Sequence, residues 1–354
     1  MSRSGGRRGR RRTPAIPARV AERRLGLVWQ VEAERCEEGI CLALAGVEHQ
    51  PAQQSLTVMT PLAWRLFELS QLRGIGPKTL RALAGRKDLG RASEEDLRYM
   101  DARLARALKE PGAFEQARSA ARQQQDQADS QDTWILCSID ADFPALLRKT
   151  DDAPMFLYVQ GSVDSLAEKA VSVIGTREPT RHGLMIAERL TQHFAEQGWS
   201  IVSGLALGCD AAAHRAALSA GGKTVAVLAH GLQTIAPLQH AELADQIVAS
   251  GGALVTEYGY GVEPALPLFV QRDRIQAGLS KGVAMIQSDL DGGSLHASRA
   301  ALRYGRRLAV PRATSADIEA SQSEIKANVL LADGGDEEKM KLLQCDAAAL
   351  SRVR

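Results

Sequence analysis

Two hydrophobic patterns divide the chain into a helical part and a strand-rich part. Between residues 61 and 110, leucines such as Leu66, Leu69 and Leu72 recur three positions apart, a spacing typical of one buried helix face. From about residue 133, short apolar runs alternate with segments of helical periodicity. The first pattern predicts a small helical domain, and the second predicts an α/β domain.

The α/β part is predicted to contain strands that are separated by single helices. The runs richest in Val, Ile and Ala are Ala170–Ile174, Ile201–Ser203, Val225–Leu228, Ala253–Glu257, Val283–Gln287 and Leu308–Val310. The helical segments between them are Leu184–Gln197, Ala211–Ala220, Ala241–Ser250, Arg272–Leu279 and Leu295–Tyr304. Such strands pair in parallel through right-handed crossovers. We therefore predict a Rossmann-like, doubly wound, mainly parallel sheet, which binds ligands beyond the carboxyl ends of its strands.

Composition suggests the remaining boundaries. Residues 1–24 contain nine arginines and one glutamate and carry +8, so the rest of the chain carries −6. This arm is predicted to be disordered. It could bind DNA phosphates electrostatically, it could be a solvated tail, or the start codon could have been assigned too early. Residues 25–130 are predicted to form the helical domain, ending in the Gln-rich stretch 115–131. Residues 131–335 form the Rossmann-like domain, and residues 336–354 form a short tail.

Several classes of protein are excluded by composition. No run of 18 apolar residues exists and the arginine-rich start lacks an apolar segment, so we expect a cytoplasmic protein without a membrane span or secretory signal. The cysteines are scattered and odd in number, which predicts free thiols in a reducing compartment rather than a disulfide framework or zinc site. They are Cys36, Cys41, Cys137, Cys209 and Cys345. No metal or cofactor is expected.

The helical domain contains a sequence that resembles a helix-hairpin-helix, or SAM-like, motif. Gly74 and Gly76 frame a tight turn, and Lys78 follows at the start of the next helix. Glycines in such a turn expose backbone N–H groups that can hold a phosphate. The motif is either an accessory DNA contact or only a turn inside a small helical domain.

Two loops at predicted carboxyl ends of strands carry groups suited to phosphate. Gly175, Thr176 and Arg177 follow one strand directly, and an arginine fork at this edge suits a phosphate. After the next strand, Ser203 and Gly204 open a loop of small residues whose N–H groups are suited to the same ligand.

The helix after the Ser203 loop carries two polar residues of interest. Asp210 is a predicted N-cap for this helix. His214 follows four residues later, and it is either catalytic or structural. We favour a structural hydrogen bond, because no nucleophile or metal ligand stands at a usable spacing.

A third segment combines arginines with an aromatic residue. Phe269 precedes Arg272, Asp273 and Arg274 at a predicted helix start. Proteins that bind single-stranded nucleic acid combine arginines, which contact phosphates, with aromatic rings, which stack on bases. Alternatively, Asp273 caps the helix and pairs with one arginine, and both interpretations can hold together.

The fourth loop is a glycine-rich helix start. Gly292 and Gly293 precede Ser294, where a helix is predicted to begin, and such a terminus favours an anion. None of these loops has the spacing of an NTPase P-loop or a dinucleotide fingerprint, so both classes are disfavoured.

Taken in order, these motifs resemble the DNA-processing protein A (Smf) family over roughly residues 135–335. They are Gly175-Thr176-Arg177, Ser203-Gly204-Leu205-Ala206 with Asp210 and Ala213-His214, Gly221-Gly222, Arg272 to Ser280, Gly293-Ser294-Leu295, Ala309-Val310-Pro311 and Asn328 to Gly334. The resemblance implies a protein that binds single-stranded DNA in a positive pocket. It also implies assistance in loading the RecA recombinase during natural transformation, and a homodimer.

By the same resemblance, Arg177 and the backbone around Ser203, Gly204 and Ser294 would hold phosphates. Arg272 and Arg274 would line the pocket, and Phe269 would stack on a base. The chain departs from the family where asparagine is usual, at Asp273 and His240. Its last 20 residues are also too short for the C-terminal winged-helix-like domain of many members.

The competing hypothesis is a nucleotide-binding sensor or a nucleoside-phosphate hydrolase of the wider Rossmann-like group. A hydrolase needs a carboxylate near a glycine-rich turn, and none follows on the first turns of the Ser294 helix. Glu257 is the one acid considered, and a structural role suits it better. General acid–base chemistry therefore lacks its residues, and we predict a binding protein.

Overall fold

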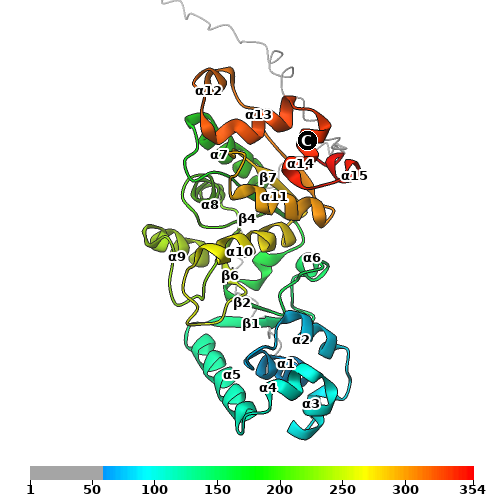
Figure 1. The fold of residues 1–354 in the computed structure, drawn as a ribbon. Helices are drawn as coiled ribbons and strands as arrows, with labels where there is room; N and C mark the ends of the chain where they lie inside the picture. The colour runs from blue at the N-terminus through cyan, green and yellow to red at the C-terminus, as the bar shows by residue number, and fades with distance from the viewer. Residues whose placement is uncertain (1–58) are drawn as a thin grey trace, which may run out of the picture. The chain divides into compact units, whose positions relative to one another are not determined.

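The computed structural model describes residues 59–354. The arginine-rich arm and the rest of residues 1–58 lie outside the described residues, so predictions about them stay predictions. The helical part comes first (Figure 1). It consists of α1 (Pro61–Ser70), α2 (Pro77–Ala84), η1 (Leu89–Arg91), α3 (Glu94–Met100), α4 (Ala102–Ala107) and α5 (Ala113–Ser130).

The leucine spacing in the helical part reflects a real buried face. Leu66 and Leu69 of α1 are fully buried, and Leu72 is 5% exposed. Phe67 of α1 packs edge-on against Phe156 of the sheet, with ring centroids 5.0 Å apart. The helical part therefore shares its core with the sheet edge. The Gln-rich stretch that was expected as a helix end or linker lies within α5 except for Gln131, and two residues separate α5 from the first strand.

Eight strands form one mixed sheet in the order β1-β2-β6-β5-β4-β3-β7-β8. The strands are β1 (Thr133–Cys137), β2 (Phe156–Gly161), β3 (Ala170–Ile174), β4 (Ser200–Ser203), β5 (Thr224–Val227), β6 (Ala253–Thr256), β7 (Gly282–Met285) and β8 (Arg307–Ala309). All pairs from β6 to β8 are parallel. The predicted doubly wound, mainly parallel sheet is thus confirmed, and all six predicted strands are present.

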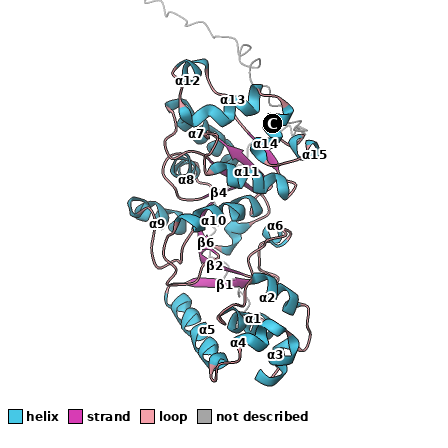
Figure 2. Ribbon diagram, in the orientation of Figure 1, coloured by secondary structure: helices cyan, strands magenta, loops and turns pink. Residues whose placement is uncertain are grey.

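Helices cover both faces of the sheet (Figure 2). On one face, Ala187 of α7 and Ala213 of α8 share a core cluster with Val171 and Val173 of β3. On the other face, Ile275 of α10 packs in a cluster that includes neighbouring strands. The helices of this part are α6 (Ala145–Arg148), η2 (Val163–Leu166), α7 (Arg181–Glu196), α8 (Cys209–Ser219), η3 (Leu238–His240), α9 (Ala241–Ala249), α10 (Leu266–Gly278) and α11 (Ser294–Arg303).

The chain after β8 folds back onto the sheet. It forms α12 (Ser315–Glu319), η4 (Ser323–Ile325), α13 (Lys326–Asp333), α14 (Asp336–Leu343) and α15 (Ala347–Leu350). Leu343 of α14 is fully buried in the cluster that contains β7 and α11, and Val353 bridges to Leu308 of β8. The segment expected as a short tail, residues 336–354, is therefore ordered against the sheet.

One edge of the sheet and the start of α10 also differ from the sequence prediction. β1 and β2 were not predicted, and they extend the sheet at one edge as antiparallel strands. The helix predicted from Arg272 begins six residues earlier, at Leu266, with Pro267 in its first turn. Proline is tolerated there because the first N–H groups of a helix have no intrahelical acceptor. No helix among residues 59–354 is long and apolar enough to cross a membrane.

Candidate nucleic-acid interface

The strand order reverses direction between β3 and β7, and this position brings two predicted loops together. β3 has β4 on one side and β7 on the other, all parallel. The connections leaving β3 and β7 therefore diverge to opposite sides, and the crevice between them is where open α/β sheets bind ligands. The Gly175–Arg177 loop follows β3, and the Gly292–Ser294 turn follows β7.

The Gly175 loop is fixed against the end of β7. The N–H of Thr176 donates to the carbonyl of Gln287 at 2.9 Å. A Cβ on Gly175 would lie 2.5 Å from the sulfur of Cys209, so no larger residue fits. Gln287 was not predicted as a site residue. Its side-chain amide donates to Thr180 Oγ1 and accepts from the Thr180 N–H, each at 2.9 Å. Gln287 could have been identified from the sequence, because it is a polar residue at the end of a predicted buried strand.

Arg177 and Phe269 meet although they lie far apart in the sequence. The Arg177 guanidinium carbon lies 5.8 Å from the centroid of the Phe269 ring. Arg177 is exposed, Phe269 is half-buried, and Arg177 forms no ion pair with any residue between 59 and 354. This pair places an uncompensated cation beside an aromatic face at the switch point of the sheet.

The Ser203 loop is held by internal hydrogen bonds. The Ser203 hydroxyl is buried and donates to the Val173 carbonyl at 2.6 Å. The Gly204 N–H donates to the Asp210 carboxylate at 3.0 Å. The prediction that Asp210 is the N-cap was wrong, because α8 begins at Cys209 with Gly208 as its N-cap. Asp210 instead reaches back from the first turn of α8, and its carboxylate occupies N–H groups that were predicted to hold phosphate.

Arg272 also has an internal role. It is 4% exposed, and Nη1 donates to the carbonyls of Gly204, at 2.7 Å, and Val227. Nε donates to Asp273 Oδ1 at 3.1 Å, so the predicted pairing of Asp273 with an arginine is confirmed. The prediction that Asp273 caps the helix was wrong, because α10 begins at Leu266 and Asp273 lies inside it. A Cβ on Gly204 would clash with the guanidinium at 2.5 Å. Arg272 thus ties the ends of β4 and β5 to α10, and its ring contact with Phe269, at 6.0 Å, holds Phe269 in place.

Asp273 makes the charge of this site depend on pH. Its side chain is 14% exposed. Burial raises the pKa of Asp273 to about 6, although Arg272 opposes the shift. Asp210 adds to the increase and Arg177 counteracts it. The carboxyl group therefore gains or loses its charge near neutral pH, within electrostatic range of Arg177.

Arg274 points away from this cluster. Its guanidinium donates to the Asp152 carbonyl at 2.9 Å and pairs with Glu257. Glu257 was expected to cap a neighbouring loop, and its observed partner is Arg274 of α10. Burial raises the pKa of Glu257, although Arg274 opposes the shift.

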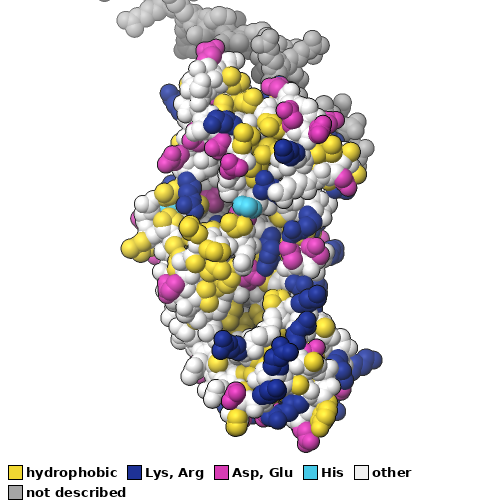
Figure 3. Space-filling model, in the orientation of Figure 1, with side chains coloured by type: hydrophobic (Ala, Val, Ile, Leu, Met, Phe, Trp, Pro, Cys, Tyr) yellow, Lys and Arg dark blue, Asp and Glu magenta, His cyan; other side chains and the backbone are white. Residues whose placement is uncertain are grey.

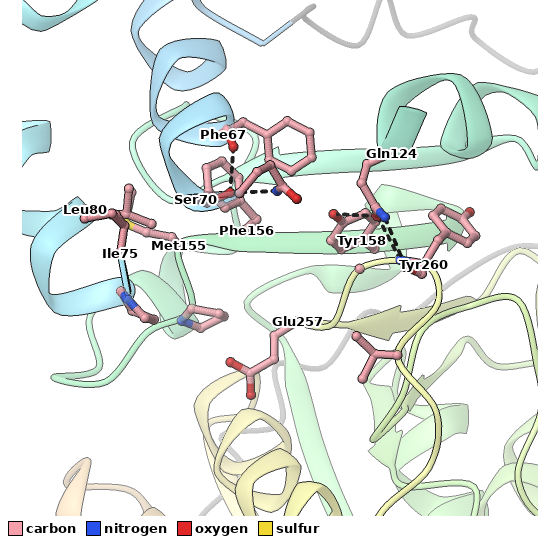
Figure 4. A pocket seen from close by; sticks show the side chains of 15 residues that line it. Phe67, Ser70, Ile75, Leu80, Gln124, Met155, Phe156, Tyr158, Glu257 and Tyr260 are labelled. Carbon is pink, nitrogen blue, oxygen red and sulfur yellow. Dashed lines mark hydrogen bonds between the residues drawn. The ribbon is translucent and has the colours of Figure 1, made fainter. Parts of the chain in front are cut away.

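Glu257 borders a pocket of about 330 Å³ between the helical part and the sheet. Its neighbours there include Phe156, Tyr158 and Tyr260 (Figure 4). Glu257 is the only carboxylate among the lining residues. A second carboxylate to complete an acid–base pair is therefore missing from this lining.

The turn before α11 has the predicted form. α11 begins at Ser294, and Gly293 is exposed. The Ser294 hydroxyl donates to Ser288 Oγ at 2.8 Å. Asn328, which was quoted only as part of the family resemblance, anchors this turn. Its side chain accepts from the Ser288 N–H at 3.0 Å and donates to the Ile286 carbonyl at 2.8 Å.

The remaining candidates are structural or lie elsewhere. His214 is fully buried, and its Nδ1 lies 2.7 Å from Thr224 Oγ1, which confirms the structural role. The described cysteines, Cys137, Cys209 and Cys345, form no disulfide with one another. The described residues contain no cluster of three or more potential metal ligands.

The predicted hairpin lies in the helical part, apart from the switch-point loops. Gly74 has φ +83°, a conformation that favours glycine. α2 begins at Pro77 with Gly76 as its N-cap, and Lys78 is exposed.

The fold and the switch-point loops define a doubly wound α/β protein with a cation and an aromatic ring at its ligand crevice. Residues 134–337 match the family model of DNA recombination-mediator protein A. The chain belongs to this family, as its motifs predicted.

Known members of the family show the same relationship. Protein Smf of Escherichia coli K12 is 40% identical over 166 residues, which are 47% of this chain and 44% of that protein. DNA processing protein DprA of Bacillus subtilis 168 is 37% identical over 171 residues, 48% of this chain and 57% of that protein. The aligned stretch thus spans about half of each relative. The X-ray structure of DNA processing protein A from Streptococcus pneumoniae superposes with a TM-score of 0.60 and 26% identity, covering 77% of this chain and 97% of that one.

Proposed function

We propose that this protein binds single-stranded DNA in the crevice between the β3 and β7 loops. The observation that carries the proposal is the contact between exposed Arg177 and the ring of Phe269, at 5.8 Å. Arg177 would contact a phosphate while Phe269 stacks on a base, the two interactions that non-sequence-specific single-strand binding combines. Thr176 and the backbone at Gly293 and Ser294 complete the proposed contact surface.

The other predicted residues have supporting places in this proposal. Ser203, Gly204 and Arg272 hold the shape of the crevice through internal hydrogen bonds. Arg274, which was predicted to line the pocket, has no direct place in it, because its guanidinium is paired with Glu257. The hairpin at Gly74, Gly76 and Lys78 would make a separate, accessory phosphate contact.

The family's role as a recombination mediator supports a second step. We propose that the bound strand is protected and passed to the RecA recombinase during natural transformation, with the protein acting as a homodimer. The contact between Arg177 and the Phe269 ring supports a binding role. The test of this step is whether the protein accelerates RecA filament assembly on oligonucleotides.

The primary test is a fluorescence polarisation titration with labelled poly-dT. We expect the protein to bind poly-dT more tightly than a duplex. The affinity for poly-dT should fall steeply as the salt concentration rises, because binding releases counterions from the contacted phosphates. Arg177→Ala should weaken binding without lowering the melting temperature. Arg312→Ala is a matched control, because Arg312 is exposed but paired with Asp333. Tight binding of a free nucleotide together with no binding of poly-dT at low salt would favour a nucleotide sensor and overturn the proposal.

A further inference from the structure

A second set of cations lies on the helical part and on α6, away from the switch-point loops. Figure 3 shows Lys and Arg side chains gathered along one side of the molecule, over α2 and α6. The exposed members on α2, on α4 and at the end of α6 are Lys78, Arg81, Arg103, Arg106, Arg148 and Lys149. We call this set the basic strip.

Hydrogen bonds show that the three elements of the basic strip adjoin one another. Arg103 of α4 donates to Thr79 Oγ1 of α2 at 3.3 Å. Arg81 of α2 donates to the carbonyls of Asp151, at 3.1 Å, and Ala153, at 2.7 Å, just beyond α6. Lys78 and Arg81 are three residues apart on α2, as are Arg103 and Arg106 on α4, so each pair shares a helix face. The cations therefore form one continuous surface.

Among the described residues, the members of the basic strip have no counterions, unlike several other surface arginines. Arg86, Arg98 and Arg312 each pair with a carboxylate, at 3.0, 2.7 and 3.1 Å. Within residues 59–354, no member of the strip forms an ion pair. Among the acids near the strip, Asp151 and Asp152 are paired with Arg303. Asp101 accepts hydrogen bonds from backbone N–H groups at the start of α4, and Asp140 accepts one from Thr60.

Backbone carbonyls hold part of the strip in place. Arg81 and Arg148 donate only to carbonyl oxygens, and Arg148 reaches the Phe143 carbonyl at 3.0 Å. These guanidinium groups are oriented but keep their net charge. Because these two side chains are already ordered, they lose little additional conformational entropy when an anion binds.

From this surface we infer a second DNA-binding site, which takes the phosphate backbone of a double helix. Single strands are held by aromatic faces as well as charge, and the exposed large aromatic side chains of residues 59–354, Tyr99 and Trp134, lie on α3 and β1. A protein partner would need apolar anchors at the centre of its interface, and the strip consists of cations. Duplex DNA presents about one negative charge per 1.7 Å of helix axis, and a protein can bind its backbone with cationic side chains alone.

The test compares two triple variants that each remove three positive charges. Arg103→Ala/Arg106→Ala/Lys149→Ala removes strip members that lie outside the hairpin and form no ion pair with any described residue. Of these, Arg103 has one side-chain hydrogen bond, to Thr79 Oγ1 at 3.3 Å. Arg86→Ala/Arg98→Ala/Arg312→Ala removes exposed, paired arginines, whose ion pairs contribute little stability. The readouts are binding of a labelled 20-base-pair duplex and of an eight-nucleotide oligo-dT between 50 and 300 mM salt, with melting temperature as a folding check.

We expect the strip variant to lose about tenfold or more in duplex affinity at low salt. The slope of log affinity against log salt should become shallower by about 2 to 3, because about 0.9 is expected per lost phosphate contact. Oligo-dT binding should change less than twofold, and the control should bind duplex as the wild type does. Absence of duplex binding, an unchanged slope in the strip variant, or an equal loss in the control would overturn the inference. Failure of oligo-dT binding alone would instead count against the proposed function.

Discussion

Arg272 and Asp273 are consecutive residues of α10 whose side chains are hydrogen-bonded, with Arg272 Nε 3.1 Å from Asp273 Oδ1. Both side chains are largely buried, at 5% and 14% exposure. Burial raises the pKa of Asp210, and the charge of Arg272 opposes this shift as well. One buried guanidinium is therefore shared between two carboxyl groups, and the site has no excess of fixed positive charge beneath Arg177.

The first prediction concerns the pH dependence of DNA binding. Because burial raises the pKa of Asp273 to about 6, protonation below pH 6 removes a negative charge near the bound phosphate. Wild-type affinity for oligo-dT should rise as pH falls from 7.5 to 5.5. Asp273→Asn, which restores the asparagine usual in the family, should bind about fivefold tighter at pH 7.5, since a charge near the surface contributes ~1 kcal/mol.

The difference between wild type and Asp273→Asn isolates this group from other titrations. The two affinities should converge near pH 5 and diverge as pH rises through about 6. A constant ratio across this range would show that Asp273 does not control the charge of the site. The same raised pKa implies that any stability contributed by protonated Asp273 is lost as pH rises through about 6.

The second prediction separates the two arginines that contact Phe269. Arg272→Ala leaves two carboxyl groups buried without their cation, so the free energy of unfolding should fall by about 3–5 kcal/mol. Arg177→Ala should leave unfolding unchanged within ~0.5 kcal/mol, because Arg177 is exposed, and should reduce oligo-dT affinity. Urea denaturation and polarisation of the same preparations provide both values. Equal stability losses in the two variants would contradict the distinction between a structural and a binding arginine.

The third prediction concerns the aromatic ring. Phe269→Leu keeps an apolar side chain but removes the stacking face, which is worth about 1–3 kcal/mol per base. We expect oligo-dT affinity to fall by roughly 5- to 30-fold for a loss of about 1–2 kcal/mol. Val270→Ala is a matched control, because Val270 is the next residue and is 45% exposed. If both variants bind equally well, the ring does not contact a base.

The sequence predicted the sheet well because parallel strands are buried on both faces and read as apolar runs. β1 and β2 were missed because an antiparallel edge lacks the alternation of strand and helix that identified the others. The edge of the sheet where Gly175 and Ser294 lie could also be predicted, since it is determined by the strand ends. The direction of each side chain could not be predicted in the same way. Arg177 and Arg272 have the same chemistry, but tertiary contacts leave one exposed and bury the other.

The fourth prediction concerns the acid sensitivity of the fold. His214 is buried with Nδ1 against Thr224 Oγ1, and Thr224 donates in turn to the Ile201 carbonyl. Burial lowers the pKa of His214 to about 3, whereas an unfolded histidine has a pKa of about 6.5. The unfolded state therefore binds the additional proton between these values, and stability decreases as pH falls below about 6.5. Between pH 7 and pH 5 the titration of His214 should lower the free energy of unfolding by about 2 kcal/mol.

His214→Gln keeps a donor for Thr224 but does not titrate, so its stability should fall by about 2 kcal/mol less than that of the wild type over this range. Urea denaturation at pH 7, 6 and 5 measures the difference, in which the contribution of Asp273 cancels. Parallel pH profiles for the two proteins would show that His214 is protonated in the folded state or accessible to solvent.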